Sequence, residues 1–268
     1  MGVTTDSAAR PPLDGVRLSS LLPDLTVEVF GTLASTNATA VQRAVAAAPH
    51  GLVIVADHQM SGRGRLDRTW ETPPGTAVTF SLLLRPETAT RSWPWLPLLT
   101  GYAVDRVIQS LGLDAGVKWP NDVLIADRKV AGILVERIDT PVGPAAVVGV
   151  GINVGLAADR LPVPTATSLE IELGVPVDRN GVLVEVLNSI REAYESWEFD
   201  GRVDGRPLAE SYAAACVTVG RQVRVDLPDG SALEGRAVGI DLTGRLVVDR
   251  QGQRHAVAAG DVIHVRPV

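Results

Sequence analysis

The spacing of apolar positions predicts four helices in the first 215 residues. Apolar residues recur every three to four positions, or alanines cluster, in residues 38–48, 96–111, 180–199 and 208–215. Ser35, Thr36 and Asn37 precede the first of these helices and can cap it, and Pro49 follows it.

Short apolar runs between turn residues predict the strands of the same part of the chain. They span residues 52–56, 76–84, 116–119, 123–126, 129–137 and 145–153. The Asp127-Arg128 pair lies between two of these runs and indicates a hairpin.

The pattern changes near residue 217 to short β runs separated by turns that contain glycine or proline. These runs span residues 217–219, 222–225, 232–240, 245–249, 255–258 and 262–265. Such closely spaced strands favour a small barrel. We therefore expect two domains, residues 1–215 and 216–268, with residues 1–12 as a loose polar tail.

Composition and charge narrow the classes of function. Hydrophobic residues make up 46% of the 268 residues, which is enough to build a core. A net charge of -6 disfavours a protein that coats nucleic acid, and no apolar run reaches the roughly 20 residues of a membrane span. The single cysteine, Cys216, excludes an intramolecular disulfide and a thiolate metal cage. Without a signal-peptide pattern, the expected location is the cytoplasm.

Residues 61–70 combine two glycines with three arginines and end in a tryptophan. We expect a loop here, because this composition does not favour a regular element. Glycines let backbone N–H groups approach a ligand, and guanidinium groups bind phosphate or carboxylate. The alternative is a solvated basic turn. The preceding buried strand and Trp70 favour a ligand loop, in which the tryptophan would wall off an apolar ligand.

Three further segments are candidates for ligand chemistry. Residues 118–122 read Lys-Trp-Pro-Asn-Asp, and Asn121 can either cap a turn or face a base edge. Gly132 interrupts an apolar strand that starts at Lys129, which indicates that another group packs close to the backbone. Residues 149–153 read Gly-Val-Gly-Ile-Asn and lack the third glycine and the following helix of a dinucleotide fingerprint.

Together these segments resemble the biotin protein ligases. The family patterns Gly-Arg-Gly-Arg with a tryptophan after four more residues, Lys-Trp-Pro-Asn-Asp, Lys-x-Ala-Gly-Ile-Leu and Gly-x-Gly-x-Asn are complete at residues 62–70, 118–122, 129–134 and 149–153. The resemblance covers about residues 30–265, and the four patterns together are highly specific for the family. It implies an α+β fold, with a mixed, mostly antiparallel sheet flanked by helices (a catalytic domain like that of class II synthetases) and a small SH3-like β-barrel at the C-terminal end.

The resemblance also implies a two-step reaction and its site. Family members join biotin to ATP, release pyrophosphate, and pass the biotinyl group from biotinyl-5′-AMP to a lysine of a carboxylase carrier domain. The implied biotin-binding residues are Ser35, Thr36, Asn37, Gln59, Gly62, Arg63, Gly64, Arg65, Trp70, Lys129, Gly132 and Leu134. The implied ATP-binding residues are Arg65, Arg68, Trp70, Lys118, Asn121 and Asn153.

Lys129 and Arg65 are the implied catalytic residues: Lys129 would hold the biotin carboxylate, and Arg65 would help close the loop over the adenylate. Mg²⁺ would accompany ATP, with Asp122 as a candidate ligand, although a turn-capping role fits this residue equally well. About 30 residues precede the region of resemblance, which is too few for the helix-turn-helix of bifunctional members. We therefore expect no DNA partner and no membrane partner.

Two other functions compete with this one. Lipoate attachment uses a related fold and the same adenylate chemistry, but the neutral polar set around Gln59 and the complete Gly-Arg loop favour biotin. A non-catalytic module that binds nucleic acid through the C-terminal barrel would need basic and aromatic surface there, and residues 217–268 contain no aromatic residue.

Overall fold

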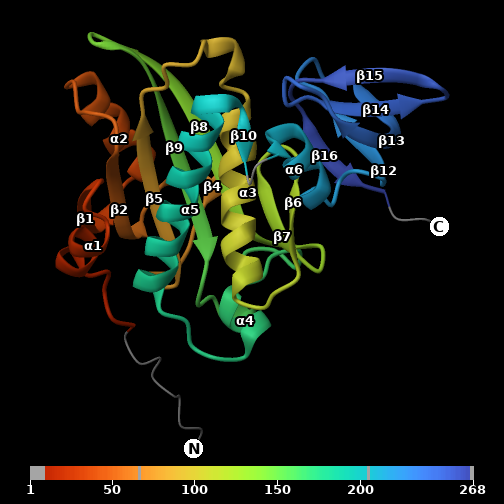
Figure 1. Ribbon diagram of the computed structural model, residues 1–268. Helices are drawn as coiled ribbons and strands as arrows, with labels where there is room; N and C mark the ends of the chain where they lie inside the picture. The colour runs from red at the N-terminus through yellow and green to blue at the C-terminus, as the bar shows by residue number, and fades with distance from the viewer. Residues whose placement is uncertain (1–9, 66–67, 204–205, 266–268) are drawn as a thin grey trace, which may run out of the picture.

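A seven-stranded sheet forms the centre of the larger part of the molecule (Figure 1). The computed structural model describes residues 10–65, 68–203 and 206–265. In sheet order the strands are β1 (Thr26–Leu33), β2 (Leu52–Gln59), β5 (Ala77–Leu84), β9 (Gly143–Asn153), β8 (Arg128–Thr140), β7 (Asp122–Ile125) and β6 (Ala115–Lys118). The β1–β2 pair is parallel and the other neighbouring pairs are antiparallel, which confirms the predicted mixed, mostly antiparallel sheet.

Helices cover both faces of this sheet. The helices of one face are α1 (Gly15–Leu21), α3 (Trp95–Ser110) and α5 (Arg179–Asp200), and Figure 1 shows α3 and α5 lying across the sheet. On the other face, α2 (Thr36–Val45) packs Ala40 and Ala44 against Ile54 and Val147. Because side chains alternate along a strand, the central strands β2, β5 and β9 contribute to both apolar layers.

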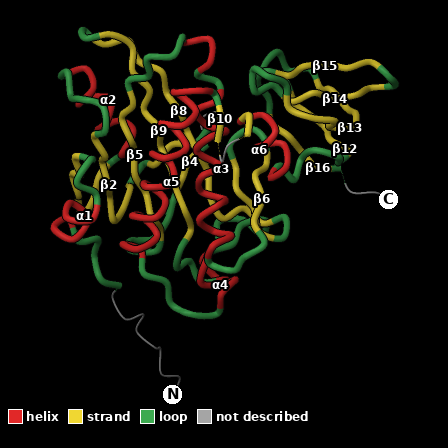
Figure 2. The backbone as a smooth tube through the Cα atoms, viewed as in Figure 1, coloured by secondary structure: helices red, strands yellow, loops and turns green. Residues whose placement is uncertain are grey.

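The remaining elements of this part are short (Figure 2). They are β3 (Gly62–Arg63), β4 (Thr69–Trp70), η1 (Thr90–Ser92), η2 (Ala158–Arg160), α4 (Leu169–Leu173), β10 (Arg202–Val203), β11 (Arg206–Pro207) and α6 (Leu208–Ala215). Among the helices of the described residues, none is both long and apolar enough to cross a bilayer.

A second, five-stranded antiparallel sheet follows α6. Its strands, in sheet order, are β15 (Gln253–Val257), β14 (Leu246–Arg250), β13 (Ala232–Ile240), β12 (Gln222–Asp226) and β16 (Asp261–His264). The predicted strand at residues 217–219 is wrong, because these residues form a turn. The division of the chain at residues 215 and 216 stays a prediction.

The second sheet is bound to the first through the edge strand β6 and two tryptophans. The backbone N–H of Val217 donates to the carbonyl oxygen of Val117 at 2.9 Å, which continues the pairing beyond β6. The indole Nε1 of Trp119, a fully buried side chain, donates to the carbonyl oxygen of Gly244, and that of Trp95 donates to Leu242, each at 3.0 Å. The turn at residues 242–244 is therefore fixed to the larger part of the molecule.

Some local predictions need correction. Helix α2 begins at Thr36 rather than at residue 38, with Ser35 as its N-cap. The hairpin turn between β7 and β8 is Ala126-Asp127, one residue earlier than predicted, and both residues have positive φ. Helix α1 and strand β1, residues 15–33, were not predicted at all.

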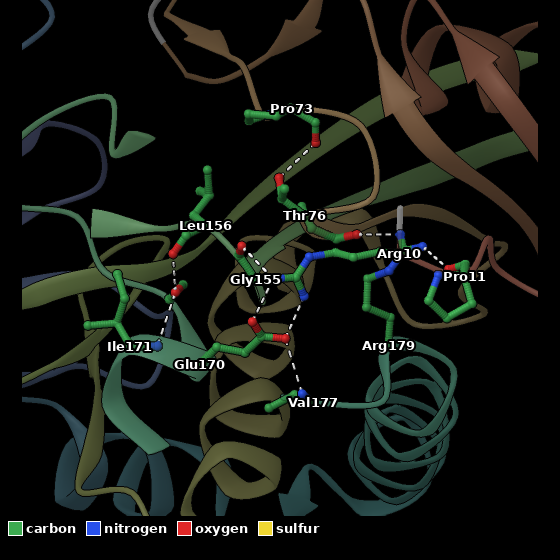
Figure 3. Close-up of polar contacts among 12 residues, drawn as sticks. Arg10, Pro11, Pro73, Thr76, Gly155, Leu156, Glu170, Ile171, Val177 and Arg179 are labelled. Carbon is green, nitrogen blue, oxygen red and sulfur yellow. Dashed lines mark hydrogen bonds and ion pairs between the residues drawn. The ribbon is translucent and has the colours of Figure 1, made fainter. Parts of the chain in front are cut away.

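Residues 10–12, the described part of the predicted loose tail, are held by the body of the protein (Figure 3). The guanidinium of Arg10 forms two hydrogen bonds with Glu170 of α4, at 2.5 and 2.6 Å, and a third with the carbonyl oxygen of Gly155. Arg10 fills the space beside Gly155, where a β-carbon would lie 2.1 Å from its Cζ. Arg179 donates to the carbonyl oxygen of Pro11 at 2.6 Å. These contacts tie the N-terminal segment to the region that follows β9.

Candidate active site

A cavity of about 1310 Å³ opens on the α2 side of the seven-stranded sheet, beyond the end of that helix. The boundary between the apolar layer and the cavity lies on the face of β9 that is turned toward α2. Ala145 and Val147 pack against α2, whereas the next positions on the same face, Gly149, Gly151 and Asn153, line the cavity. The two glycines remove side chains where the cavity begins, so the sequence itself ends the apolar layer there.

Side chains from other segments occupy the space that the glycines leave. A β-carbon at Gly149 would lie 2.1 Å from Oδ1 of Asn37, and one at Gly151 would lie 2.5 Å from Cε2 of Trp70. Gly132 of β8 pairs directly with Gly151, and a β-carbon there would lie 3.0 Å from Nζ of Lys129 and 3.4 Å from the Trp70 ring. The prediction that another group packs against Gly132 is thus confirmed.

Residues 61–70, called the Gly-Arg segment below, contain more regular structure than the predicted loop. Its two ends form a short antiparallel ladder, in which Gly62 pairs with Trp70 and Arg63 pairs with Thr69. A β-carbon at Gly62 would lie 2.3 Å from the carbonyl oxygen of Trp70, so glycine permits this pairing. Residues 66–67, at the tip, lie outside the described residues. The ladder places Trp70 over the sheet.

A buried set of neutral polar groups forms one end of the cavity. Oε1 of Gln59 accepts a hydrogen bond from the backbone N–H of Thr36 at 2.7 Å. Oγ of Ser81, a fully buried residue of β5, lies 2.8 Å from Oγ1 of Thr36 and 2.5 Å from Oδ1 of Asn37. Ser81 was not among the predicted site residues, because a serine in an otherwise apolar strand gives no motif signal.

Glu136 connects this neutral end to the Gly-Arg segment. Its Oε2 accepts hydrogen bonds from Nδ2 of Asn37 at 2.7 Å and from Nη2 of Arg63 at 3.0 Å. Gly132, Leu134 and Glu136 are alternate residues of β8 and therefore share one face of the strand.

The centre of the cavity contains a lysine–aspartate pair. Nζ of Lys129 lies 2.6 Å from Oδ1 of Asp122 and 5.7 Å from the centre of the Trp70 ring. The described residues contain no cluster of three or more His, Cys, Asp or Glu side chains placed to hold a metal ion. Asp122 is thus a single carboxylate at this point.

The second sheet contributes to the same cavity. Arg65 donates to Oδ1 of Asn121 at 3.0 Å and to the carbonyl oxygen of Gly260 at 3.3 Å. Burial lowers the pKa of the Arg65 guanidinium. Arg68 forms an ion pair with Asp261 at the start of β16. The Gly-Arg segment therefore bridges the two sheets.

Arg221 and His264 line the cavity next to Lys118. Nη1 of Arg221 lies 2.6 Å from Oδ1 of Asp127 and 3.2 Å from Nδ1 of His264, whose Nε2 lies 3.1 Å from Oγ1 of Thr218. Burial, with Lys118 and Arg221 nearby, lowers the pKa of His264 to about 4, so its imidazole is neutral near pH 7. Within the described residues, Lys118 has no carboxylate partner.

The structure brings the predicted site residues together. All of them except Gly62 line the cavity, and Gly62 lies next to it beside Gln59. The amide nitrogens of two predicted ATP-binding residues are engaged by the protein: Nδ2 of Asn121 donates to the carbonyl oxygen of Ile133, and Nδ2 of Asn153 donates to that of Thr167. The individual roles of these residues stay predictions.

Comparisons with known proteins agree with this geometry. Residues 30–153 match the model of the Biotin/lipoate A/B protein ligase family, and residues 218–265 match the Biotin protein ligase C terminal domain. The chain is 37% identical to a biotin--[acetyl-CoA-carboxylase] ligase of Mycobacterium tuberculosis, over 98% of this chain and 100% of the relative. It is 34% identical to the bifunctional ligase/repressor BirA of Bacillus subtilis, over 89% of this chain and 76% of the relative.

Among solved structures, the biotin protein ligase from Aquifex aeolicus in complex with biotin and ATP superposes with a TM-score of 0.75 and 26% identity, covering 90% of this chain and 99% of that one. The fold and the cavity thus define a protein of the biotin and lipoate ligase class. Within that class, the chain belongs to the biotin protein ligase family.

Proposed function

We propose that this protein activates biotin with ATP to form biotinyl-5′-AMP and pyrophosphate, and then transfers the biotinyl group to a lysine of a biotin carboxyl-carrier domain. The observation that carries the proposal is one cavity in which a neutral polar end adjoins a lysine and a group of cations. Its occupants would be a ligand with a polar, uncharged head and a carboxylate, and a polyphosphate.

The neutral end suits the ureido ring of biotin. Because Oε1 of Gln59 is engaged by Thr36, the Gln59 amide nitrogen is the group left to donate to a ligand. Trp70 lies over Gly132 and Gly151 and would line the apolar body of biotin. A buried site that satisfies ring N–H and C=O groups discriminates strongly against acyl chains that lack them, such as lipoate.

The charged part of the cavity suits ATP. Two unit charges at about 4 Å repel by roughly 4 kcal/mol at an effective dielectric of 20, so a carboxylate approaches a phosphate only among cations. The cations that line the described part of the cavity are Arg63, Arg65, Arg68, Lys118, Lys129 and Arg221. The lining carboxylates there are Glu71, Asp122, Asp127 and Asp261. The local balance is positive in a chain of net charge -6.

Lys129 would carry the first step. Its present partner, Asp122, is a carboxylate, and the biotin carboxylate would replace or share that contact. Lys129 would then neutralise the charge that develops as the carboxylate attacks the α-phosphorus and pyrophosphate leaves. Mg²⁺ would reach the site bound to ATP phosphates, and one nearby carboxylate, Asp122, fits the one or two protein ligands that Mg²⁺ commonly takes in such sites.

The Gly-Arg segment would protect the adenylate. Arg63, Arg65 and Arg68 contact Glu136, Gly260 and Asp261 around the cavity, which supports a segment that would exclude water until the carrier lysine arrives. The carrier would be the domain of an acyl-CoA or pyruvate carboxylase, and the reaction would take place in the cytoplasm.

A pyrophosphate-release assay tests the proposal. The purified chain with ATP and Mg²⁺ is given biotin, lipoate or no acid, and a carrier domain is then added and blotted for biotin. Biotin-dependent release followed by labelling of the carrier is the expected result. Release with lipoate but not with biotin, or no release with either acid, would refute it.

A further inference from the structure

The polar network at the neutral end of the cavity ends on a carboxylate, Glu136, which lies two residues after the pattern at residues 129–134 and has no predicted role. Its side chain is 29% exposed and lies between the Gly-Arg segment and α2. Oε2 is the shared acceptor for Asn37 and Arg63, so one oxygen holds two residues from different elements. A residue with these contacts can affect ligand binding without touching the ligand.

The carboxylate fixes which way the Asn37 amide points. An ionised carboxylate only accepts hydrogen bonds, so the group 2.7 Å from Oε2 must be the amide nitrogen of Asn37. The carbonyl oxygen of Leu134, 3.4 Å away, also requires the nitrogen on this side. The Asn37 amide oxygen therefore faces Ser81.

The orientation of Asn37 fixes the hydrogens of the next two groups. The Ser81 hydroxyl has one hydrogen, and the amide oxygen 2.5 Å away cannot donate, so Ser81 donates to Asn37. The 2.8 Å contact between the hydroxyls of Ser81 and Thr36 is then donated by Thr36. Oε1 of Gln59 can also accept from the Thr36 hydroxyl, at 3.1 Å, but the shorter contact with Ser81 needs a hydrogen between its two oxygens, and that of Ser81 is already given to Asn37. The hydrogens thus run from Thr36 through Ser81 and Asn37 to Glu136.

We infer that Glu136 is a positioning residue for biotin, because it sets the direction of this chain and leaves the Thr36 oxygen as an acceptor facing the cavity. Thr36 lines the cavity, and with its hydrogen directed at Ser81 its lone pairs are free for a ligand N–H. A ureido ring offers two such N–H groups. This inference rests on the proposed function. It adds a reason why the site would select a ring that donates a hydrogen bond to Thr36.

The charge of Glu136 has a second consequence for the same end of the cavity. Nη2 of Arg63 lies 3.0 Å from Oε2, so its cation is neutralised beside the neutral polar set. An unpaired guanidinium there would attract the carboxylate of biotin to the wrong end of the cavity. The pair therefore favours one orientation of the ligand.

The test uses Glu136→Gln, which keeps the size of the side chain but allows it to donate as well as accept. The matched control is Asp139→Asn on the same strand, whose carboxylate pairs with Arg137 at 2.7 Å and is 77% exposed. Biotin binding is measured by calorimetry, and the KM values for biotin and ATP by pyrophosphate release. Thermal melting checks that each variant is folded.

We expect Glu136→Gln to weaken biotin binding about tenfold while the KM for ATP changes less than twofold, and Asp139→Asn to match the wild type. A biotin analogue with methylated ring nitrogens cannot donate to Thr36, so its weak binding should be the same in the wild type and in Glu136→Gln.

Unchanged biotin binding in a folded Glu136→Gln variant would overturn the inference, as would equal losses for biotin and for the methylated analogue. A parallel rise in the KM for ATP would also overturn it, since that result indicates a general structural role. If the wild type itself does not bind biotin, the proposed function fails instead.

Discussion

Gly151→Ala tests whether the site depends on the close packing of Trp70 against the glycines of β8 and β9. The new methyl group would sit 2.5 Å from Cε2, 2.7 Å from Cζ2 and 2.8 Å from Nε1 of the indole. Carbon atoms in contact are about 3.5–4.0 Å apart, so the ring must move by about 1 Å or more. The indole is rigid and Trp70 is paired with Gly62, so it cannot rotate away freely.

A displacement of about 1 Å at a reacting site can lower the rate up to about 10²-fold. We therefore expect Gly151→Ala to reduce kcat/KM for biotin about 10- to 100-fold, which corresponds to about 1.4–2.7 kcal/mol of transition-state stabilisation. The assay is biotin-dependent pyrophosphate release at varied biotin concentration. The gain of roughly 0.5–1 kcal/mol that alanine brings to a strand offsets part of this crowding, and thermal melting checks that the variant is folded.

The control is Gly31→Ala in β1, a strand glycine with no atom within 4 Å of its added β-carbon. This variant should retain wild-type activity. If Gly151→Ala keeps wild-type kcat/KM, the position of Trp70 over the sheet does not matter for catalysis. If both variants lose activity equally, the loss results from replacing any strand glycine and not from the displacement of Trp70.

Three further results are expected. Lys129→Ala should lower the rate of pyrophosphate release by about 10²–10³-fold with an unchanged circular dichroism spectrum, and a near wild-type rate would remove Lys129 from the catalytic residues. Arg10→Ala should lower the melting temperature by about 2–8 °C, because it removes about 1–2 kcal/mol of charged hydrogen bonding to Glu170. The same hydrogen bonds lower the pKa of Glu170. An unchanged melting curve would contradict this role of Arg10. His264 resists protonation down to about pH 4 in the folded state, so the unfolded state takes up this proton first as the pH falls below about 6.5. The free energy of unfolding should therefore fall between about pH 6.5 and pH 4, and His264→Asn should reduce this slope in denaturant titrations; an equal slope would show that other groups cause it.

Much of the larger sheet could be predicted because its strands are apolar runs bounded by turn residues. The glycines of β8 and β9 were also informative: an isolated glycine in an apolar strand indicates a close neighbour, and Trp70 and Lys129 are the neighbours of Gly132. Strand β1 lies at the edge of the sheet and has no fully buried residue, and its polar residues interrupt the apolar run that marks the inner strands.

The individual contacts that the second sheet makes with the site could not be predicted. The contact from Arg65 to Gly260 joins residues 195 positions apart, and no local pattern marks either as the partner of the other. Likewise, Glu136 and Arg10 act through single side-chain contacts with distant residues. Periodicity reports which face of an element is buried, but it does not report which distant group covers that face.

The cavity has a consequence for how the protein is made. Its lining extends along the chain from Ser35 to Val265, so a growing polypeptide can form the seven-stranded sheet before β16 exists. At about 5–20 residues per second, the last lining residues follow the first by roughly 10–50 s. During this time Arg65 and Arg68 lack the groups at residues 260–261 that hold them. A nascent chain would therefore have an incomplete enclosure for a reactive anhydride, and only the finished chain would retain it.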